Sequence, residues 1–145
     1  MKPRSLIVIL AAAMSHAAAQ TGAVTLPPTL TMQPGAVSEL APVLDRALAA
    51  YNAGDMRALL AEFATSAPAI HAEGACERLF EGYYKTEFGR LQSKQIDLKE
   101  SVPDRDRAAL AYDAVFQKRP KAKIIANFIR ENGAVKLMQI RIEKL

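Results

Sequence analysis

The chain has 145 residues, a formal net charge of +4 and 50% hydrophobic side chains. This length suits one globular domain with its own core. The net charge falls to +2 without Lys2 and Arg4 of the first nineteen residues, and so small a positive charge argues against a nucleic-acid partner. The single cysteine, Cys76, excludes a disulfide within the chain.

The first nineteen residues have the order of a secretory signal peptide. Lys2 and Arg4 form a positive head, an apolar run follows at 6–14, and three alanines at 17–19 supply the small residues that signal peptidase requires. The apolar run is about nine residues long, whereas a membrane span needs roughly 20. The pattern therefore predicts an exported protein, periplasmic or secreted, without a membrane span.

Residues 20–37 form a predicted flexible spacer that is rich in proline and threonine. They include Pro27, Pro28 and Pro34 and no charged residue. Neither a helical nor a strand period is sustained there, which favours an extended linker. A single domain is therefore expected over residues 38–145.

The first expected helix of this domain has one apolar face. Its apolar residues recur at helical spacing: Leu40, Val43, Leu44, Ala47, Leu48 and Tyr51. Ser38 or Ala41 is the expected N-cap, with Pro42 close to the start, where proline is tolerated. Gly54 is expected to end the helix because glycine adopts positive φ at low cost.

Two further helices are expected before the apolar spacing changes from a helical to a strand period. Asp55 is placed to cap a short second helix, and residues 65–74 then form a connection. A third helical pattern begins near Cys76 and is expected to stop at Gly89.

Beyond the third helix the apolar spacing changes to period 2, which predicts four strands. The first is expected to extend to Val102 and the second to span 108–117. The last two, at 121–131 and 134–144, are joined by an Asn-Gly pair at 132–133, a strong hairpin signal. The expected fold class is α+β, with N-terminal helices packed on one face of a curved four-stranded antiparallel sheet.

Three segments carry a resemblance to a known family: A-Y-N-A-G-D at 50–55, residues 83–91, and F-I-R-E-N-G-A-V-K-L-M-Q-I-R-I at 128–142. In these segments and in its order of elements the chain resembles the nuclear transport factor 2-like (cystatin-like cone) superfamily, in particular small exported bacterial domains of unknown function. The resemblance implies a curved sheet around a long helix, forming a cone whose open end holds a ligand. Catalytic members similar to ketosteroid isomerase use an Asp base and a Tyr/Asp oxyanion hole.

The candidate ligand-binding residues are aromatic side chains and one amide: Tyr51, Phe80, Tyr83, Tyr84, Tyr112, Phe128 and Asn127. A hydrophobic core also contains such a set of aromatic side chains. Because Tyr83 and Tyr84 are adjacent, one is expected to pack and the other to lie at a rim. Asn127 could face either the cone or solvent, whereas Asp113 alternates with bulky residues and is expected on the outer face.

No cofactor or metal is expected. His71 and Cys76 are five residues apart, which does not match the paired ligands of zinc sites. Cys76 lies in series with Leu79 and Phe80, so a packed thiol is favoured over an activated nucleophile.

Three functions remain open at this stage. The leading one is a non-catalytic binding module that holds a small apolar ligand or a protein partner. The second is an isomerase-like or cyclase-like enzyme that uses a buried Asp or Tyr in the cone. The third is an interaction protein acting through the outer sheet face, where aliphatic residues such as Ile125 and Ile129 also predict a homodimer.

Overall fold

The computed structural model describes residues 34–102 and 107–145. The predicted signal peptide and residues 20–33 of the predicted spacer lie outside the described residues. The helical elements are α2 (Pro34–Ala53), α3 (Met56–Ala61), α4 (Pro68–His71), η5 (Glu77–Tyr84) and α5 (Lys85–Phe88). The strands are β1 (Leu91–Ile96), β2 (Arg107–Phe116), β3 (Ala122–Glu131) and β4 (Ala134–Lys144).

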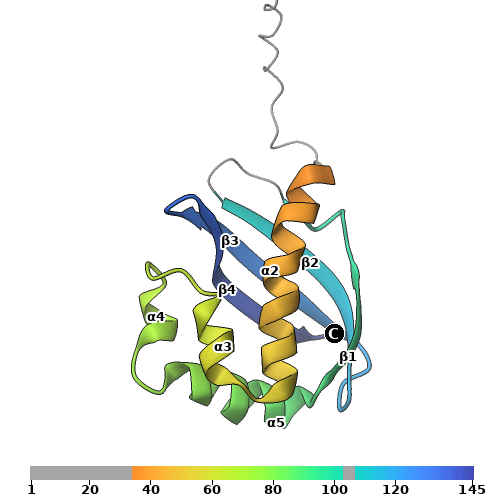
Figure 1. The fold of residues 1–145 in the computed structure, drawn as a ribbon. Coiled ribbons are helices and arrows are strands. Elements are labelled where there is room, and N and C mark those ends of the chain that lie inside the picture. The colour runs from red at the N-terminus through yellow and green to blue at the C-terminus, as the bar shows by residue number, and fades with distance from the viewer. Residues whose placement is uncertain (1–33, 103–106) are drawn as a thin grey trace, which may run out of the picture.

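The four strands form one antiparallel sheet in the order β1-β2-β3-β4, which confirms the predicted α+β meander. Helix α2 crosses one face of the curved sheet, and α3 and α4 lie beside the β4 edge (Figure 1). None of the helices in the described part of the chain is long and apolar enough to cross a membrane.

Helix α2 begins earlier than the sequence pattern suggested. It starts at Pro34, so residues 34–37 of the predicted spacer are helical, and neither Ser38 nor Ala41 is the N-cap. Proline suits a first helical position because its φ is already helical, and Val37 packs against the core. Pro42 consequently lies inside the helix, where it removes one backbone donor and crowds the preceding turn.

The next helices follow the prediction in position but not in every detail. The Asp55 side chain caps α3 by accepting a hydrogen bond from the Ala58 N–H at 3.0 Å, as expected. The connection at 65–74 contains the short helix α4, which has Pro68 at its start. The third helix ends at Gly89 with a φ of 74°, as predicted.

Element η5 is a π-helix, which the sequence pattern did not reveal. Its hydrogen bonds span five residues, as in the bond from the Lys85 N–H to the Phe80 carbonyl that closes it. A π-helix has a wider turn than an α-helix, and such segments often occur at functional sites.

Strand β1 was predicted to extend to Val102, but it ends at Ile96. The Asp97 carboxylate accepts hydrogen bonds from the backbone of Lys99 and Glu100, which turns the chain away from the sheet. Lys123 on β3 binds this turn through Asp97 at 3.1 Å and Glu100 at 3.0 Å. The segment meets β2 again where the Ser101 hydroxyl accepts the Ala111 N–H at 3.0 Å and an isolated bridge joins Val102 to Ala109.

The β3–β4 hairpin forms as predicted. Asn132 and Gly133 have φ values of 54° and 81°, the two positive values that a type I′ turn requires. Farther along β4, Met138 has no partner on β3, because Asn127 pairs with Gln139 and Phe128 pairs with Leu137. This bulge lets Leu137 and Ile140, three residues apart, both face the core.

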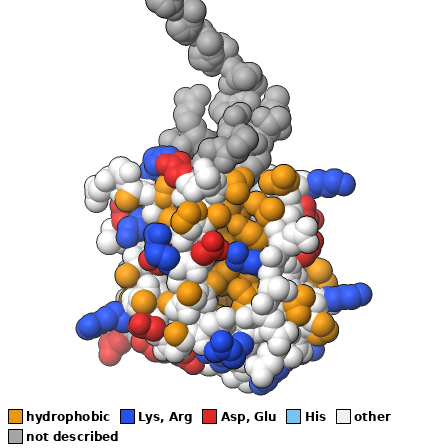
Figure 2. Space-filling model, turned by 45° about the vertical axis from the view of Figure 1, so that its right-hand side comes forward, with side chains coloured by type: hydrophobic (Ala, Val, Ile, Leu, Met, Phe, Trp, Pro, Cys, Tyr) orange, Lys and Arg blue, Asp and Glu red, His pale blue; other side chains and the backbone are white. Residues whose placement is uncertain are grey.

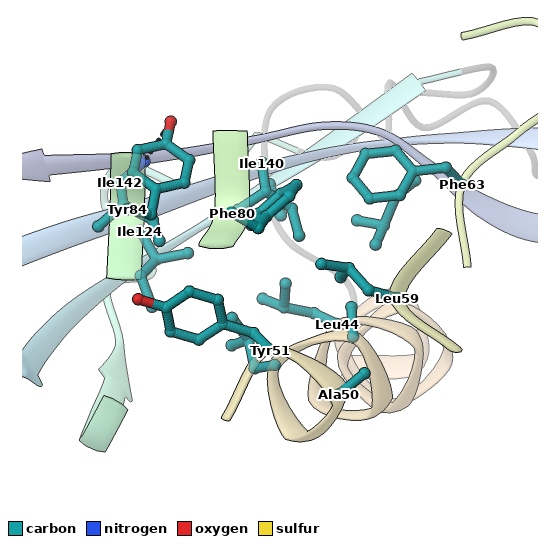
Figure 3. Close-up of a cluster of buried hydrophobic side chains, with 14 of the residues drawn as sticks. Leu44, Ala50, Tyr51, Leu59, Phe63, Phe80, Tyr84, Ile124, Ile140 and Ile142 are labelled. Carbon is teal, nitrogen blue, oxygen red and sulfur yellow. Dashed lines mark hydrogen bonds between the residues drawn. The ribbon is translucent and has the colours of Figure 1, made fainter. Parts of the chain in front are cut away.

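The core lies between the helices and one face of the sheet. The β2 residues predicted to share a face are all buried: Leu110, Tyr112, Ala114 and Phe116. Phe80 lies at the centre, with its ring 6.3 Å from Tyr51, 6.2 Å from Phe63 and 5.5 Å from Tyr84 (Figure 3).

A second apolar region lies where α2 borders β1. Figure 2 shows this side of the molecule, where hydrophobic side chains gather at the centre together with acidic and basic ones. Here Lys94 on β1 binds Asp45 on α2 at 2.7 Å and lies 4.7 Å from the centre of the Tyr112 ring. The ion pair thus joins α2 to the first edge of the sheet, and the cation–π contact joins β1 to β2.

Candidate functional site

A cavity of about 930 Å³ lies between the α4 and η5 segments and the β2–β4 part of the sheet. Its volume is near the upper end of the range for small-molecule sites. Apolar side chains make up most of its wall: Phe63, Ala67, Pro68, Ala69, Ile70, Ala75, Leu79, Phe80, Val102, Ala108, Ala109, Phe128, Met138 and Ile140. The polar residues of the wall are Tyr84, Asn127, Gln139 and Arg141.

The helical wall of the cavity comes from η5 and the turn before it, through Ala75, Leu79, Phe80 and Tyr84. The buried residues of this segment recur every four positions, at Cys76, Phe80, Tyr84 and Phe88. Tyr84 is 7% exposed in this row, whereas its neighbour Tyr83 is 55% exposed.

The β4 edge is closed at two points on this side. The backbone of Leu137 pairs with Glu62 and Ala64 in a short parallel bridge. Farther along, the Tyr84 hydroxyl accepts a hydrogen bond from the Ile142 N–H at 3.3 Å. In Figure 3 the Tyr84 hydroxyl points away from Tyr51 toward β4.

The electrostatics of this end of the cavity centre on Tyr84. Burial raises the pKa of its hydroxyl above the ordinary value, and the hydrogen bond from Ile142 opposes that rise. The charge of Arg141 also lowers this pKa, while that of Glu143 raises it. The hydroxyl is therefore protonated at neutral pH, and two charged groups lie close enough to act on it.

Four of the seven predicted site residues line the cavity: Phe80, Tyr84, Asn127 and Phe128. Asn127, whose orientation the sequence left open, is half-buried and donates to the Gln139 side chain at 3.1 Å. The prediction that one of the two adjacent tyrosines packs and the other lies outside is confirmed.

The other three predicted residues lie elsewhere. Tyr51 is fully buried, and its hydroxyl donates to the Gly89 carbonyl at 2.7 Å. Tyr112 is buried beneath Lys94 near α2, and Tyr83 is exposed to solvent. None of these three is among the residues that line the cavity.

Several residues that line the cavity were not among the predicted site residues. The α4 residues belong to a segment taken as a connection, although Pro68 is a recognised helix-start signal. Arg141 alternates with Ile140 and Ile142, which indicated an outer-face position. No local signal shows that it borders a cavity, because that depends on η5 lying against the β4 edge.

The other residues considered for chemistry, Cys76, His71 and Asp113, make packing or surface contacts. Cys76 is buried, as predicted, and burial followed by the charge of Glu77 raises the pKa of its thiol to about 11. The exposed His71 has its Nε2 2.9 Å from the Ala64 carbonyl oxygen. Asp113 is on the outer face, as expected, and pairs with Lys123 at 3.3 Å. Within residues 34–102 and 107–145, no group of three His, Cys, Asp or Glu residues could hold a metal ion.

No protein-family model and no curated protein matches this chain. Among solved structures, it is similar to a protein of unknown function with a cystatin-like fold from Nostoc punctiforme PCC 73102. The two are 18% identical with a TM-score of 0.52, and the match covers 79% of this chain and 95% of the other. This likeness shows the fold alone: helices followed by a curved four-stranded antiparallel sheet of the cystatin-like kind.

Proposed function

We propose that this chain is an exported, non-catalytic binding module that holds a small apolar ligand in the cavity beside α4 and η5. The observation that carries the proposal is the cavity itself, about 930 Å³ in volume, with a mainly apolar wall and a few polar groups. Ligand sites commonly combine these two features. Export rests on the order of charge, apolar run and alanines in residues 1–19.

The composition of the wall favours binding over acid–base catalysis. An isomerase-like reaction needs a positioned base, usually a carboxylate or imidazole. Among the described residues, those that line the cavity include no Asp, Glu, His, Lys or Cys, and Tyr84 holds its proton at neutral pH. These groups can orient a ligand through hydrogen bonds but do not supply a base.

The test uses a neutral fluorescent probe, N-phenyl-1-naphthylamine, and a substitution that fills the cavity. Leu79 lines the cavity, so Leu79→Trp is expected to weaken probe binding at least about tenfold. Leu98→Trp adds the same side chain at an exposed turn and should leave binding unchanged. Circular dichroism checks that both variants fold. If the wild-type protein does not bind the probe, or if Leu79→Trp binds it as tightly as Leu98→Trp, the proposal fails.

The outer sheet face supports a second element of the proposal, a homodimer. Ile125 and Ile129 on β3 are half-buried there, and Val115 on β2 is 37% exposed. Pairing of two such faces would remove these side chains from water. Light scattering should give a dimer mass that Ile125→Lys reduces to a monomer mass. A wild-type protein that remains monomeric over a wide concentration range would rule out this dimer.

A further inference from the structure

The cavity has a polar end at the β4 edge, where three of its lining residues carry hydrogen-bond donors. They are the Tyr84 hydroxyl, the guanidinium of Arg141 and the backbone N–H of Ile140, and all three residues line the cavity. The rest of the wall is mainly apolar. The arrangement raises the question of what chemical group these donors would bind.

The Tyr84 hydroxyl has a donor to spare. It accepts the Ile142 N–H at 3.3 Å, and among the described residues it donates to no acceptor. Its side chain is 7% exposed, so bulk water has little access to it. A buried hydroxyl hydrogen without an acceptor is uncommon in folded proteins and indicates that a ligand or water completes the site.

The backbone N–H of Ile140 is a second donor that faces away from β3. In an antiparallel edge strand, alternate residues direct their N–H and C=O groups away from the neighbouring strand. Ile142 directs its N–H outward to Tyr84, and Ile140, two residues earlier, has the same phase. The segment from Glu62 to Ala64 covers the edge only at Leu137. The edge is therefore open at Ile140, between its two closed points.

Arg141 is the one residue with a formal charge in the part of the cavity wall that the structure describes. Its Nε donates to Glu143 at 2.9 Å, and no described residue binds its two terminal nitrogens. The two side chains are 45% and 46% exposed, so their ion pair contributes little. The free end of a guanidinium is a planar fork that matches a carboxylate.

We infer that the ligand of this cavity is an amphipathic carboxylic acid, with its carboxylate bound by Arg141, the Tyr84 hydroxyl and the Ile140 N–H and its apolar body against Phe80 and Phe128. This inference rests on the proposed binding function and names the class of ligand. A carboxylate offers about four lone-pair sites and no donor, which complements a group made only of donors. Glu143 is the competing carboxylate, since it already occupies one nitrogen of Arg141.

The test compares dodecanoate with dodecanol, which has the same tail and a neutral head, by isothermal titration calorimetry at low salt. Both are used below the concentrations at which they aggregate. The wild-type protein should bind dodecanoate about tenfold more tightly than dodecanol, because hydrogen bonds to a charged group are stronger than those to a neutral one. Raising the salt concentration should narrow this difference, since Arg141 is partly exposed.

Three variants and one control show which residues cause the preference for dodecanoate. Arg141→Gln should weaken dodecanoate binding more than dodecanol binding and so remove the preference for dodecanoate. Lys144→Gln, an equal loss of charge on the same strand, should keep that preference. Tyr84→Phe should lose part of the preference. Glu143→Gln should strengthen dodecanoate binding, because it frees the guanidinium.

The outcomes separate this inference from the proposed function. If dodecanol binds the wild-type protein as tightly as dodecanoate, or if Arg141→Gln keeps the preference, the carboxylate inference is wrong and the apolar binding site stands. If the protein binds neither compound and also fails to bind N-phenyl-1-naphthylamine, both proposals are wrong.

Discussion

The hydroxyl of Tyr51 donates a 2.7 Å hydrogen bond to the carbonyl oxygen of Gly89, which joins the last turn of α2 to the end of α5. Beside it, Asn52 binds both backbone groups of Leu91: its Oδ1 accepts the N–H at 2.8 Å and its Nδ2 donates to the carbonyl at 2.9 Å. These contacts fix the point where the helices end and the sheet begins. They also connect two of the segments that carry the family resemblance, 50–55 and 83–91.

Removing the Tyr51 hydroxyl should destabilise the fold. Tyr51→Phe leaves the Gly89 carbonyl without this donor in a buried position, and we expect the free energy of unfolding to fall by about 1–2 kcal/mol. Urea unfolding followed by circular dichroism measures the change. Tyr83→Phe, at a side chain that is 55% exposed, serves as the matched control and should shift the midpoint little. Equal stability of the two variants would contradict a structural role for this hydrogen bond.

Asn52 provides a graded test of the same junction. Asn52→Ala loses both contacts with Leu91 and should cost about 1–3 kcal/mol. Asn52→Asp keeps the acceptor for the Leu91 N–H and loses the donor, so its stability should be intermediate. The order wild type, Asp, Ala in urea midpoints is the expected result. An Asp variant no more stable than Ala would show that the acceptor does not outweigh the repulsion between the new carboxylate oxygen and the Leu91 carbonyl oxygen.

Local signals were sufficient for much of the fold. The Asn-Gly pair at 132–133 predicted the hairpin because a type I′ turn needs two positive φ values, and the alternation over 108–117 predicted the buried face of β2. Asp55 predicted its own helix cap in the same way. Each of these features depends on residues close together in the chain.

The parts that sequence could not predict depend on distant contacts. Tyr84 is buried beside its exposed neighbour Tyr83 and contacts Ile142, fifty-eight residues away, and no residue near Tyr84 in the sequence predicts that contact. The bulge at Met138 changes which side chains of β4 face inward, without a glycine or proline to mark it. The aromatic composition therefore identified Phe80 and Phe128, but not the polar end at Arg141.

The loop before α4 predicts a pH dependence of stability. Glu131 accepts hydrogen bonds from the Thr65 N–H at 3.0 Å, the Thr65 hydroxyl at 2.7 Å and the Ser66 N–H at 3.1 Å. These bonds lower the pKa of its carboxyl below the ordinary value of 4.5. A group whose pKa is lower in the folded state stabilises the fold above its unfolded pKa, and this contribution is lost as the pH falls through the folded pKa.

Glu131→Gln should therefore reduce the loss of stability between neutral pH and pH 3. Urea midpoints at both pH values measure this, with Glu73→Gln as the control because no described residue is hydrogen-bonded to the Glu73 side chain. The control should keep the wild-type difference between the two pH values. If Glu131→Gln also keeps the full difference, other carboxylates account for the acid sensitivity.

The last prediction concerns the thiol of Cys76. It is 2% exposed, and its pKa of about 11 leaves it protonated at mildly alkaline pH. Because the thiolate is the reactive form, Ellman's reagent should react with the native protein only as fast as the fold opens. Leu98→Cys in a Cys76→Ala background places a thiol at a position that is 57% exposed in the wild type and should react at once. Denaturant should bring the two rates together, whereas a native Cys76 that reacts as rapidly as the exposed thiol would show that this part of the core opens readily.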